Sequence, residues 1–301
     1  MPDGIVLSCT GGRYGVYVDG HRLEAVLRGR MKHRSDETVL VGDRVVLALH
    51  GPEAATIEGI HPRRTLLRRR SPGRARGVRA LAANIDQVVV VGAARMPDWD
   101  PALMDRFTAV AEANDLPIVI VVNKADLDAS ATAHGVPYRQ AGYPVIVTSA
   151  TAGTGLGALR RQLAGAVSLF TGPTGVGKST LLNALVPGLT LRTAVVSRRS
   201  HAGRHTTVAA EMHPLGDEGF VVDTPGLRDI GLWGLDPLEV GAAFPEFASR
   251  RDGCRFDNCR HRDEPSCAVR AAVDRGDIAG TRYTSYRRLL DEAEAAARPW
   301  T

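Results

Sequence analysis

Apolar and polar residues alternate over short stretches in the first 60 residues, and this pattern predicts β-strands. Glycine-containing pairs such as Asp19-Gly20 separate the stretches, as hairpin turns do. The predicted strands are Ile5–Ser8, Tyr14–Val18, Arg22–Val26, Arg44–Leu49 and Ala54–Ile60. Five short strands in this length favour a small β-barrel of the OB type over residues 1–62, with an SH3-like barrel or an open sheet as alternatives.

After residue 83 the pattern changes to continuous apolar runs separated by helical periodicity. The apolar runs are Gln87–Val91, Pro117–Val122, Val145–Thr148, Ser168–Thr171 and Gly219–Val222, and the helical patterns are Pro101–Asn114, Leu156–Leu163 and Ser179–Leu185. Continuous apolar runs are typical of strands that are buried on both faces. The alternation predicts a doubly wound parallel α/β sheet over residues 83–232, with ligands at the carboxyl ends of its strands.

The stretch after residue 232 has helical patterns around a cluster of metal-binding residue types. The helices are predicted over Pro237–Ser249, with a break near Pro245, over Ala268–Arg275 and over Thr281–Ala297. Between them lies the motif Cys254-x4-Cys259-x-His261-x5-Cys267. Three thiolates and an imidazole complete the tetrahedral shell of a structural Zn²⁺. We therefore expect a small α-helical zinc-binding domain over residues 233–301.

A P-loop follows one of the predicted buried strands and opens a helix, which is the context this motif requires. It comprises Gly172, Pro173, Thr174, Gly175, Val176, Gly177, Lys178, Ser179 and Thr180. Its glycines let backbone N–H groups approach phosphates. Lys178 is expected to reach the β- and γ-phosphates and Ser179 to ligate Mg²⁺.

Two further motifs predict that the nucleotide is GTP or GDP rather than ATP. The carboxylate of Asp126, in Asn123-Lys124-Ala125-Asp126, can accept from N1–H and the 2-amino group of guanine. Adenine offers neither donor and would leave that carboxylate unpaired. Ser149-Ala150 ends the next predicted strand, and its Ala150 N–H is placed to donate to guanine O6.

The stretch after the P-loop is expected to sense the γ-phosphate. In Asp223-Thr224-Pro225-Gly226, Asp223 would hold Mg²⁺ through water and the Gly226 N–H would contact the γ-phosphate. Thr207 is favoured over Thr206 as a further Mg²⁺ ligand and as part of the catalytic machinery with Lys178.

The residue that orients the attacking water is not settled by the sequence. Leu227 follows the sensing turn at the place where Ras-like enzymes carry a glutamine, and leucine cannot orient water. His205 is the candidate that we favour, although a surface histidine without a role is equally open. His201 and Arg204 are weaker candidates.

Arginines cluster in the connector over residues 63–82, and we expect them to face no nearby acids. They are Arg63, Arg64, Arg68, Arg69, Arg70, Arg74, Arg76 and Arg79. Like charges at this density predict an exposed, mobile segment that can contact nucleic-acid phosphates. The net charge of +5 alone is much weaker evidence for a nucleic-acid partner than this cluster. There is neither a run of about 18 apolar residues nor a signal-peptide pattern, so we expect a cytoplasmic protein away from membranes.

The guanine motif precedes the P-loop, which is the reverse of the usual order and indicates a circularly permuted P-loop GTPase. The chain resembles the RsgA (YjeQ) family from end to end. The likeness rests on the permuted order, GPTGVGKST, GRHTT, DTPG and the Cys/His spacing. It implies a late-stage assembly factor of the 30S ribosomal subunit that binds 16S rRNA near the decoding region. It also implies GTP hydrolysis stimulated by the subunit, and other assembly factors are further candidate partners.

Three other functions remain as alternatives. In a regulatory GTP-binding module, RNA or protein binding would be the output and hydrolysis incidental. A permuted GTPase of the large subunit is the second alternative, against which the barrel and the zinc motif weigh. An RNA-binding protein with a degenerate nucleotide site is the third, and intact Lys178, Ser179, Asp126 and Asp223 argue against it. Nothing in the sequence indicates a homo-oligomer, so a monomer is expected.

Overall fold

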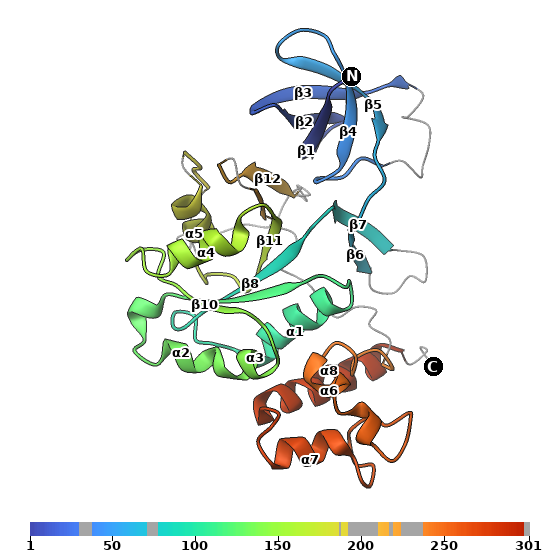
Figure 1. Ribbon diagram of the computed structural model, residues 1–301, viewed down its shortest axis with the longest axis vertical. Helices are drawn as coiled ribbons and strands as arrows, with labels where there is room; N and C mark the ends of the chain where they lie inside the picture. Colours follow the sequence, from blue (N-terminus) through green and yellow to red (C-terminus); the bar gives the residue numbers. More distant parts are fainter. Residues whose placement is uncertain are drawn as a thin grey trace, which may run out of the picture.

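The computed structural model describes residues 1–29, 38–70, 78–186, 188–191, 210–216, 219–223 and 237–297 of the 301-residue chain. Figure 1 shows a β-barrel at one end, a sheet flanked by helices in the middle and a helical region at the other end. None of the helices in these described ranges has both the length and the apolar character of a membrane span.

The N-terminal strands close into a barrel of the OB type, as the sequence predicted. They are β1 (Asp3–Thr10), β2 (Arg13–Val18), β3 (His21–Leu27), β4 (Arg44–Leu49) and β5 (Ala54–Ile60). The pairs β1–β2, β2–β3, β4–β5 and β1–β4 are antiparallel, and β3–β5 is parallel. Alternate residues such as Val6, Val16, Leu47 and Ile57 point inward and are fully buried in one apolar cluster.

The central sheet contains the strands β8 (Gln87–Ala93), β9 (Ile118–Asn123), β10 (Val145–Val147), β11 (Val167–Thr171), β12 (Glu211–Pro214) and β13 (Phe220–Asp223). Their order is β10-β9-β8-β11-β13-β12, and all pairs are parallel except β12–β13. The predicted parallel sheet is confirmed. The sequence did not indicate β12, because this four-residue edge strand has no apolar run.

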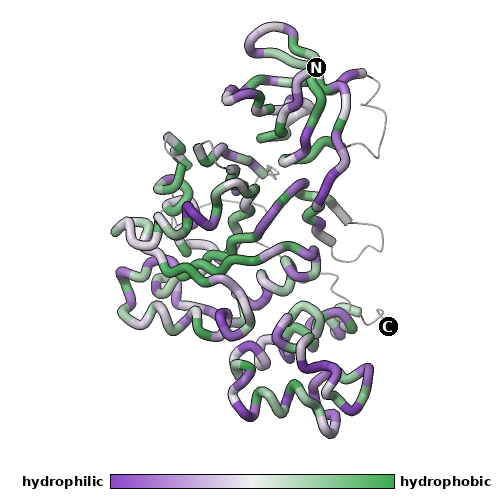
Figure 2. The backbone as a smooth tube through the Cα atoms, viewed as in Figure 1, coloured by the Kyte–Doolittle hydropathy of each residue, from purple (hydrophilic) through white to green (hydrophobic). Residues whose placement is uncertain are grey.

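Helices cover both faces of this sheet (Figure 1). They are α1 (Pro101–Glu112), α2 (Ala131–His134), α3 (Val136–Gln140), α4 (Leu156–Leu163) and α5 (Lys178–Leu185). Val88 and Val90 of β8 belong to the core cluster that includes α1 residues, whereas Val89 and Val91 belong to the cluster that includes α4 and α5 residues. Successive side chains of a strand point to opposite faces, so both faces need apolar residues. Figure 2 shows these strands as a green band through the centre of the molecule.

The barrel is attached to the edge of the central sheet. Ser8 of β1 pairs with Glu211 of β12 in antiparallel register. The ring of Tyr17 meets that of Phe220 edge-on at a centroid distance of 5.5 Å, and Arg22 lies 3.6 Å from the Glu211 carboxylate. The barrel therefore contacts the two strands that lead to Asp223.

The arginine connector is more ordered and better paired than the sequence suggested. Its described part forms the hairpin β6 (Leu66–Arg70) and β7 (Val78–Ala83), with Leu67 buried. Arg63 binds the buried Asp43 carboxylate through two bonds of 2.7 and 2.8 Å, and Arg64 lies 3.0 Å from Asp86. The expectation that the arginines face no acids is wrong at these two positions, because the acids come from distant parts of the chain.

The C-terminal region consists of short helices packed around one long helix. They are α6 (Pro245–Ala248), the 3-10 helix η4 (Arg251–Gly253), α7 (Ala268–Asp274) and α8 (Gly280–Ala297). The helix predicted over Pro237–Ser249 is wrong in its first half, where residues 237–243 form turns. Phe244 has an extended backbone because proline disfavours the helical region for the preceding residue, so only one helical turn follows.

A buried arginine on α8 joins this region to the central domain. Arg282 is 1% exposed and donates to Asp105 of α1 at 2.7 Å and to Glu246 of α6 at 2.8 and 3.1 Å. Its guanidinium also lies 4.6 Å from the centre of the Phe244 ring. Burial raises the pKa of Asp105, and Arg282 opposes that rise. Both carboxylates therefore depend on one cation.

Replacing Arg282 with methionine is expected to destabilise the protein by about 3–5 kcal/mol, because two carboxylates stay buried without their cation. Thermal and urea unfolding would measure this loss. The matched control is Arg288→Met on the same helix, whose exposed pair with Glu292 contributes at most about 1 kcal/mol. Equal losses for the two variants would show that the buried pair does not hold the region in place.

Candidate nucleotide site and metal centre

The P-loop joins β11 to α5, and its glycines are required by the backbone. Gly172 has a φ of +135°, and a Cβ there would lie 2.1 Å from the Val91 carbonyl oxygen. Gly177 has a φ of +93°, and a Cβ there would lie 2.6 Å from Nδ2 of Asn123. Larger residues would be strained and would clash. The loop therefore keeps its backbone close to the neighbouring strands, and it leads directly into the N-terminus of α5, the kind of place where phosphates bind.

The side chains of the loop divide into one core anchor and several that remain accessible. Val176 is 1% exposed and packs into the apolar cluster with α5. Lys178 Nζ donates to the carbonyl oxygens of Gly172 at 2.6 Å and Pro173 at 2.7 Å. Thr174 is exposed, and Ser179 and Thr180 are half-buried in the first turn of α5. The lysine thus lies across the loop that is predicted to hold phosphates.

The guanine motif contacts the P-loop directly, although the two are about 50 positions apart in the chain. Asn123 Nδ2 donates to the Val176 carbonyl at 2.9 Å. Its Oδ1 accepts from the Thr148 hydroxyl at 3.1 Å and from the Ala150 N–H at 3.3 Å. Asn123 is 1% exposed. This one side chain therefore joins the P-loop to the segment Thr148–Ala150, which is predicted to contact the base.

Lys124 and Asp126 extend the same contact surface. Lys124 has a φ of +58°, and its Nζ donates to Gly175 O at 2.7 Å and to the Met96 carbonyl. Asp126 lies in the 3-10 helix η2 (Ala125–Leu127), where its Oδ1 accepts from the Ser149 hydroxyl at 2.5 Å. Ser149 thereby restrains the carboxylate that is predicted to bind guanine.

The contact with Met96 was not foreseen from the sequence. Met96 and Pro97 belong to the loop after β8, and Pro97 Cδ would lie 3.6 Å from a Cβ built at Gly175. The interaction of Met96 uses a backbone carbonyl, which every residue type carries. No residue pattern could have marked it.

Asp223 is the last residue of β13 and pairs with Phe170 of β11, two residues before Gly172. The parallel register therefore brings Asp223 and the P-loop to the same edge of the sheet. The other predicted γ-phosphate and catalytic residues lie outside the described residues: His201, Arg204, His205, Thr207, Gly226 and Leu227. Their roles stay predictions.

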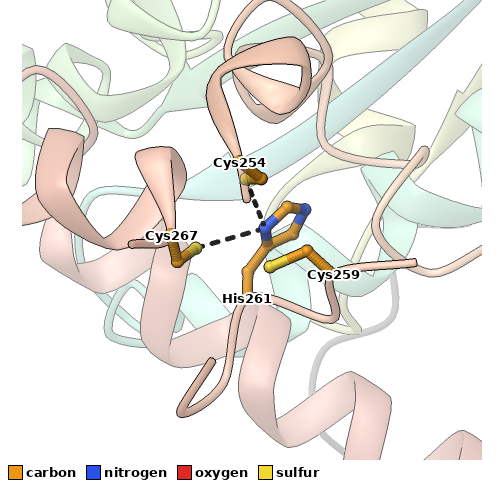
Figure 3. A group of neighbouring side chains, drawn as sticks. All are labelled: Cys254, Cys259, His261 and Cys267. Carbon is orange, nitrogen blue, oxygen red and sulfur yellow. Dashed lines mark hydrogen bonds between the residues drawn. The ribbon is translucent and has the colours of Figure 1, made fainter. Parts of the chain in front are cut away.

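The predicted metal ligands come together in the C-terminal region (Figure 3). The ligand atoms of Cys254, Cys259, His261 and Cys267 all lie within 4.8 Å of one another. His261 Nδ1 is 3.4 Å from Cys267 Sγ and 3.7 Å from Cys254 Sγ. A tetrahedral Zn²⁺ with bonds of about 2.0–2.3 Å separates its ligand atoms by about 3.5–3.8 Å. The four residues therefore fit Zn²⁺.

The surrounding groups hold the ligand loop in place. Two tyrosines of α8 donate to its carbonyls, Tyr283 to His261 O at 2.6 Å and Tyr286 to Arg260 O at 2.5 Å. Cys267 caps the N-terminus of α7. Burial raises the pKa of Cys259 to about 12, so a metal must displace a proton from this thiol near neutral pH.

The predicted RNA-contact arginines fall into two groups. Arg63 binds the buried Asp43 carboxylate, whereas Arg64, which pairs with Asp86, and Arg68 on β6 are both exposed. The side chains of Arg69, Arg70, Arg74, Arg76 and Arg79 lie outside the described residues.

Comparisons with known proteins agree over the whole length. A family model described as RsgA GTPase matches residues 60–233. The small ribosomal subunit biogenesis GTPase RsgA of Gemmatimonas aurantiaca is 49% identical over 296 residues, which cover 96% of each chain. The protein of the same name from Moorella thermoacetica is 44% identical over 302 residues, 99% of this chain and 100% of that one.

Solved structures show the same arrangement. The crystal structure of YjeQ from Thermotoga maritima is similar with a TM-score of 0.81 and 34% identity, and the match covers 99% of both chains. YloQ, described as a circularly permuted GTPase, is similar with a TM-score of 0.77 and 27% identity over 100% of this chain and 97% of that one.

Proposed function

The chain belongs to the RsgA family of circularly permuted GTPases, and on that premise we propose that it is a late-stage assembly factor of the small ribosomal subunit. The family is one of GTP-hydrolysing enzymes. The observation that carries the proposal is full-length likeness: relatives named for small-subunit biogenesis match the chain from the barrel to the metal centre. The proposed place of action is the cytoplasm, as a monomer.

The nucleotide site supports a division of roles among its residues. Asp126 and the Ala150 N–H recognise guanine, and Asn123 keeps their two loops on the P-loop. Lys178 reaches the phosphates, which requires it to exchange its two carbonyl contacts for phosphate oxygens. Ser179, Thr207 and, through water, Asp223 would hold Mg²⁺, which would supply positive charge to the β- and γ-phosphates.

Water positioning is assigned to His205 in this proposal. Leu227 offers no hydrogen-bonding group at the position that serves this role in Ras-like enzymes. Hydrolysis is then slow until a partner places the histidine, which makes the subunit the activator of the reaction.

The proposed partner surface is 16S rRNA near the decoding region of the 30S subunit. The barrel, the arginines of the connector from Arg64 onward and the metal centre supply its basic residues. Arg63 is left out of this surface, since it binds the buried Asp43 carboxylate, whereas Arg64 is exposed and stays part of it. Phosphate contacts of this kind weaken as salt is raised.

The test is GTP turnover by the purified protein, alone and with small or large subunits. We expect at least tenfold stimulation by the small subunit, because the subunit completes the water-positioning group, and none by the large subunit. A His205→Ala variant should bind GTP normally and lose the stimulated rate. Stimulation by the large subunit would contradict the proposed partner. Tight GTP binding without stimulation by either subunit would favour a binding module.

A further inference from the structure

An exposed aromatic ring lies between two of the metal ligands. Phe256 is 40% exposed and falls within the Cys254–Cys259 segment. The other phenylalanines of this region behave differently, since Phe244 and Phe247 are buried in its apolar cluster. The core is therefore complete without Phe256, and its exposure is not explained by packing.

The backbone that carries this ring is held at several points. Phe256 O accepts from the Cys259 N–H at 3.1 Å, and the Arg255 N–H donates to Ser266 O at 3.3 Å. Arg251 Nη2 donates to the carbonyl of Asp257 at 3.1 Å. With both flanking cysteines bound to a metal, the ring is presented in a fixed position. A fixed ring loses little conformational entropy when it binds a partner.

An arginine lies against the ring. The guanidinium carbon of Arg255 lies 5.5 Å from the centre of the Phe256 ring. Within the described ranges, Arg251, Arg255 and Arg270 form no ion pair with a carboxylate. Their neighbours Arg260 and Arg262 do form such pairs, with Glu294 and, for Arg262, also with Asp291. Arg255 therefore lies beside the ring, and Arg251 is held near it by its bond to the Asp257 carbonyl, and neither guanidinium is paired with a carboxylate in the described part of the chain.

We propose that Phe256 is a stacking platform for an unpaired nucleotide of the small-subunit RNA, with Arg255 and Arg251 binding the adjacent phosphates. Single-stranded RNA exposes base faces that stack on aromatic side chains, and arginines beside the ring neutralise its backbone. A protein partner would use the apolar area of the ring and has no need of the free arginines. This inference rests on the proposed function and gives the metal centre a defined contact.

The test compares substitutions that separate stacking from apolar contact. Phe256→Leu keeps an apolar side chain but removes the π face, and it should weaken binding to purified small subunits roughly tenfold to hundredfold. Phe256→Trp should retain wild-type affinity or exceed it. Metal content, thermal unfolding and GTP turnover without subunits should be unchanged in both variants, which excludes misfolding as the cause.

The affinity of the same variants is also measured for a labelled single-stranded RNA 12-mer and for its duplex. This separates failure of the proposed function from failure of the stacking platform. If the wild type does not bind small subunits, the proposed function fails, and the 12-mer still decides the stacking. Weaker 12-mer binding by Phe256→Leu, with little change for the duplex, supports the platform. The stacking platform is overturned if Phe256→Leu binds both the small subunit and the 12-mer as tightly as the wild type does. It is also overturned if Phe256→Ala binds weakly while Phe256→Leu does not, because that result indicates apolar contact.

Discussion

Removing the metal from the Cys254, Cys259, His261 and Cys267 centre is expected to unfold the ligand loop and α7 while the barrel and nucleotide site stay folded. The segment from Arg251 to Cys267 contains one 3-10 turn and otherwise irregular backbone. Its order therefore depends on cross-links rather than on repeated hydrogen bonds. A structural Zn²⁺ contributes about 10–16 kcal/mol to the folding of zinc-finger peptides.

The remaining contacts of the loop are too few to replace that contribution. Cys259 and Cys267 join an apolar cluster with Phe247 and Tyr286, two tyrosine hydroxyls bind loop carbonyls, and Arg260 and Arg262 form ion pairs with carboxylates of α8. Partly exposed ion pairs contribute at most about 1 kcal/mol each. A hydrogen bond adds only about 0.5–1.5 kcal/mol net. The central domain has separate cores on each face of its sheet, so loss of the loop leaves it intact.

The measurement is limited proteolysis and far-UV circular dichroism after chelation, with metal content determined in parallel. Cleavage should begin between residues 251 and 267, and GTP binding should persist. Cys259→Ser should reproduce the effect. Cys9→Ser is the matched control, because Cys9 lies in the barrel, half-buried and away from the metal centre. A metal-free protein with unchanged protease resistance would show that packing alone orders the loop.

Much of the architecture was predictable because it depends on local patterns. The barrel strands alternate with period two, and β8 and β9 are apolar throughout because both of their faces are covered. The helix over Ala268–Arg275 was predicted to within one residue of α7. The metal motif is short in sequence, so its four residues could be expected to lie close together.

The features that the sequence did not predict are contacts between residues far apart in the chain. Arg63 was expected to be exposed, and only the fold brings Asp43 to it. The β1–β12 contact and the pairing of Arg282 with Asp105 join segments about 180–200 residues apart. In the nucleotide site, the motif residues were found by their side chains, whereas the Met96 carbonyl carries no such signal.

Replacing Asp126 with asparagine is expected to lower GTP affinity by about 10³–10⁵-fold, because a site built around a polar group rejects a ligand that leaves it unpaired. One carboxylate oxygen accepts from Ser149 Oγ at 2.5 Å, and this bond restrains the side chain. An asparagine there keeps one oxygen to accept from Ser149 and from N1–H. Its amide, however, presents a donor to the 2-amino group of guanine, which is itself a donor.

Xanthine nucleotides provide the test of this geometry, since xanthine carries a carbonyl oxygen where guanine carries its 2-amino group. The Asp126→Asn variant should therefore bind and hydrolyse XTP with much of the efficiency that the wild type shows for GTP. Titrating GTP and XTP against the wild type and the variant measures this change in nucleotide specificity. Asp128→Asn is the control, because Asp128 binds Ser130 in the following turn rather than the guanine loops. An Asp126→Asn variant that lost GTP without gaining XTP would mean that Asp126 supports the loop, and that guanine is read by other groups.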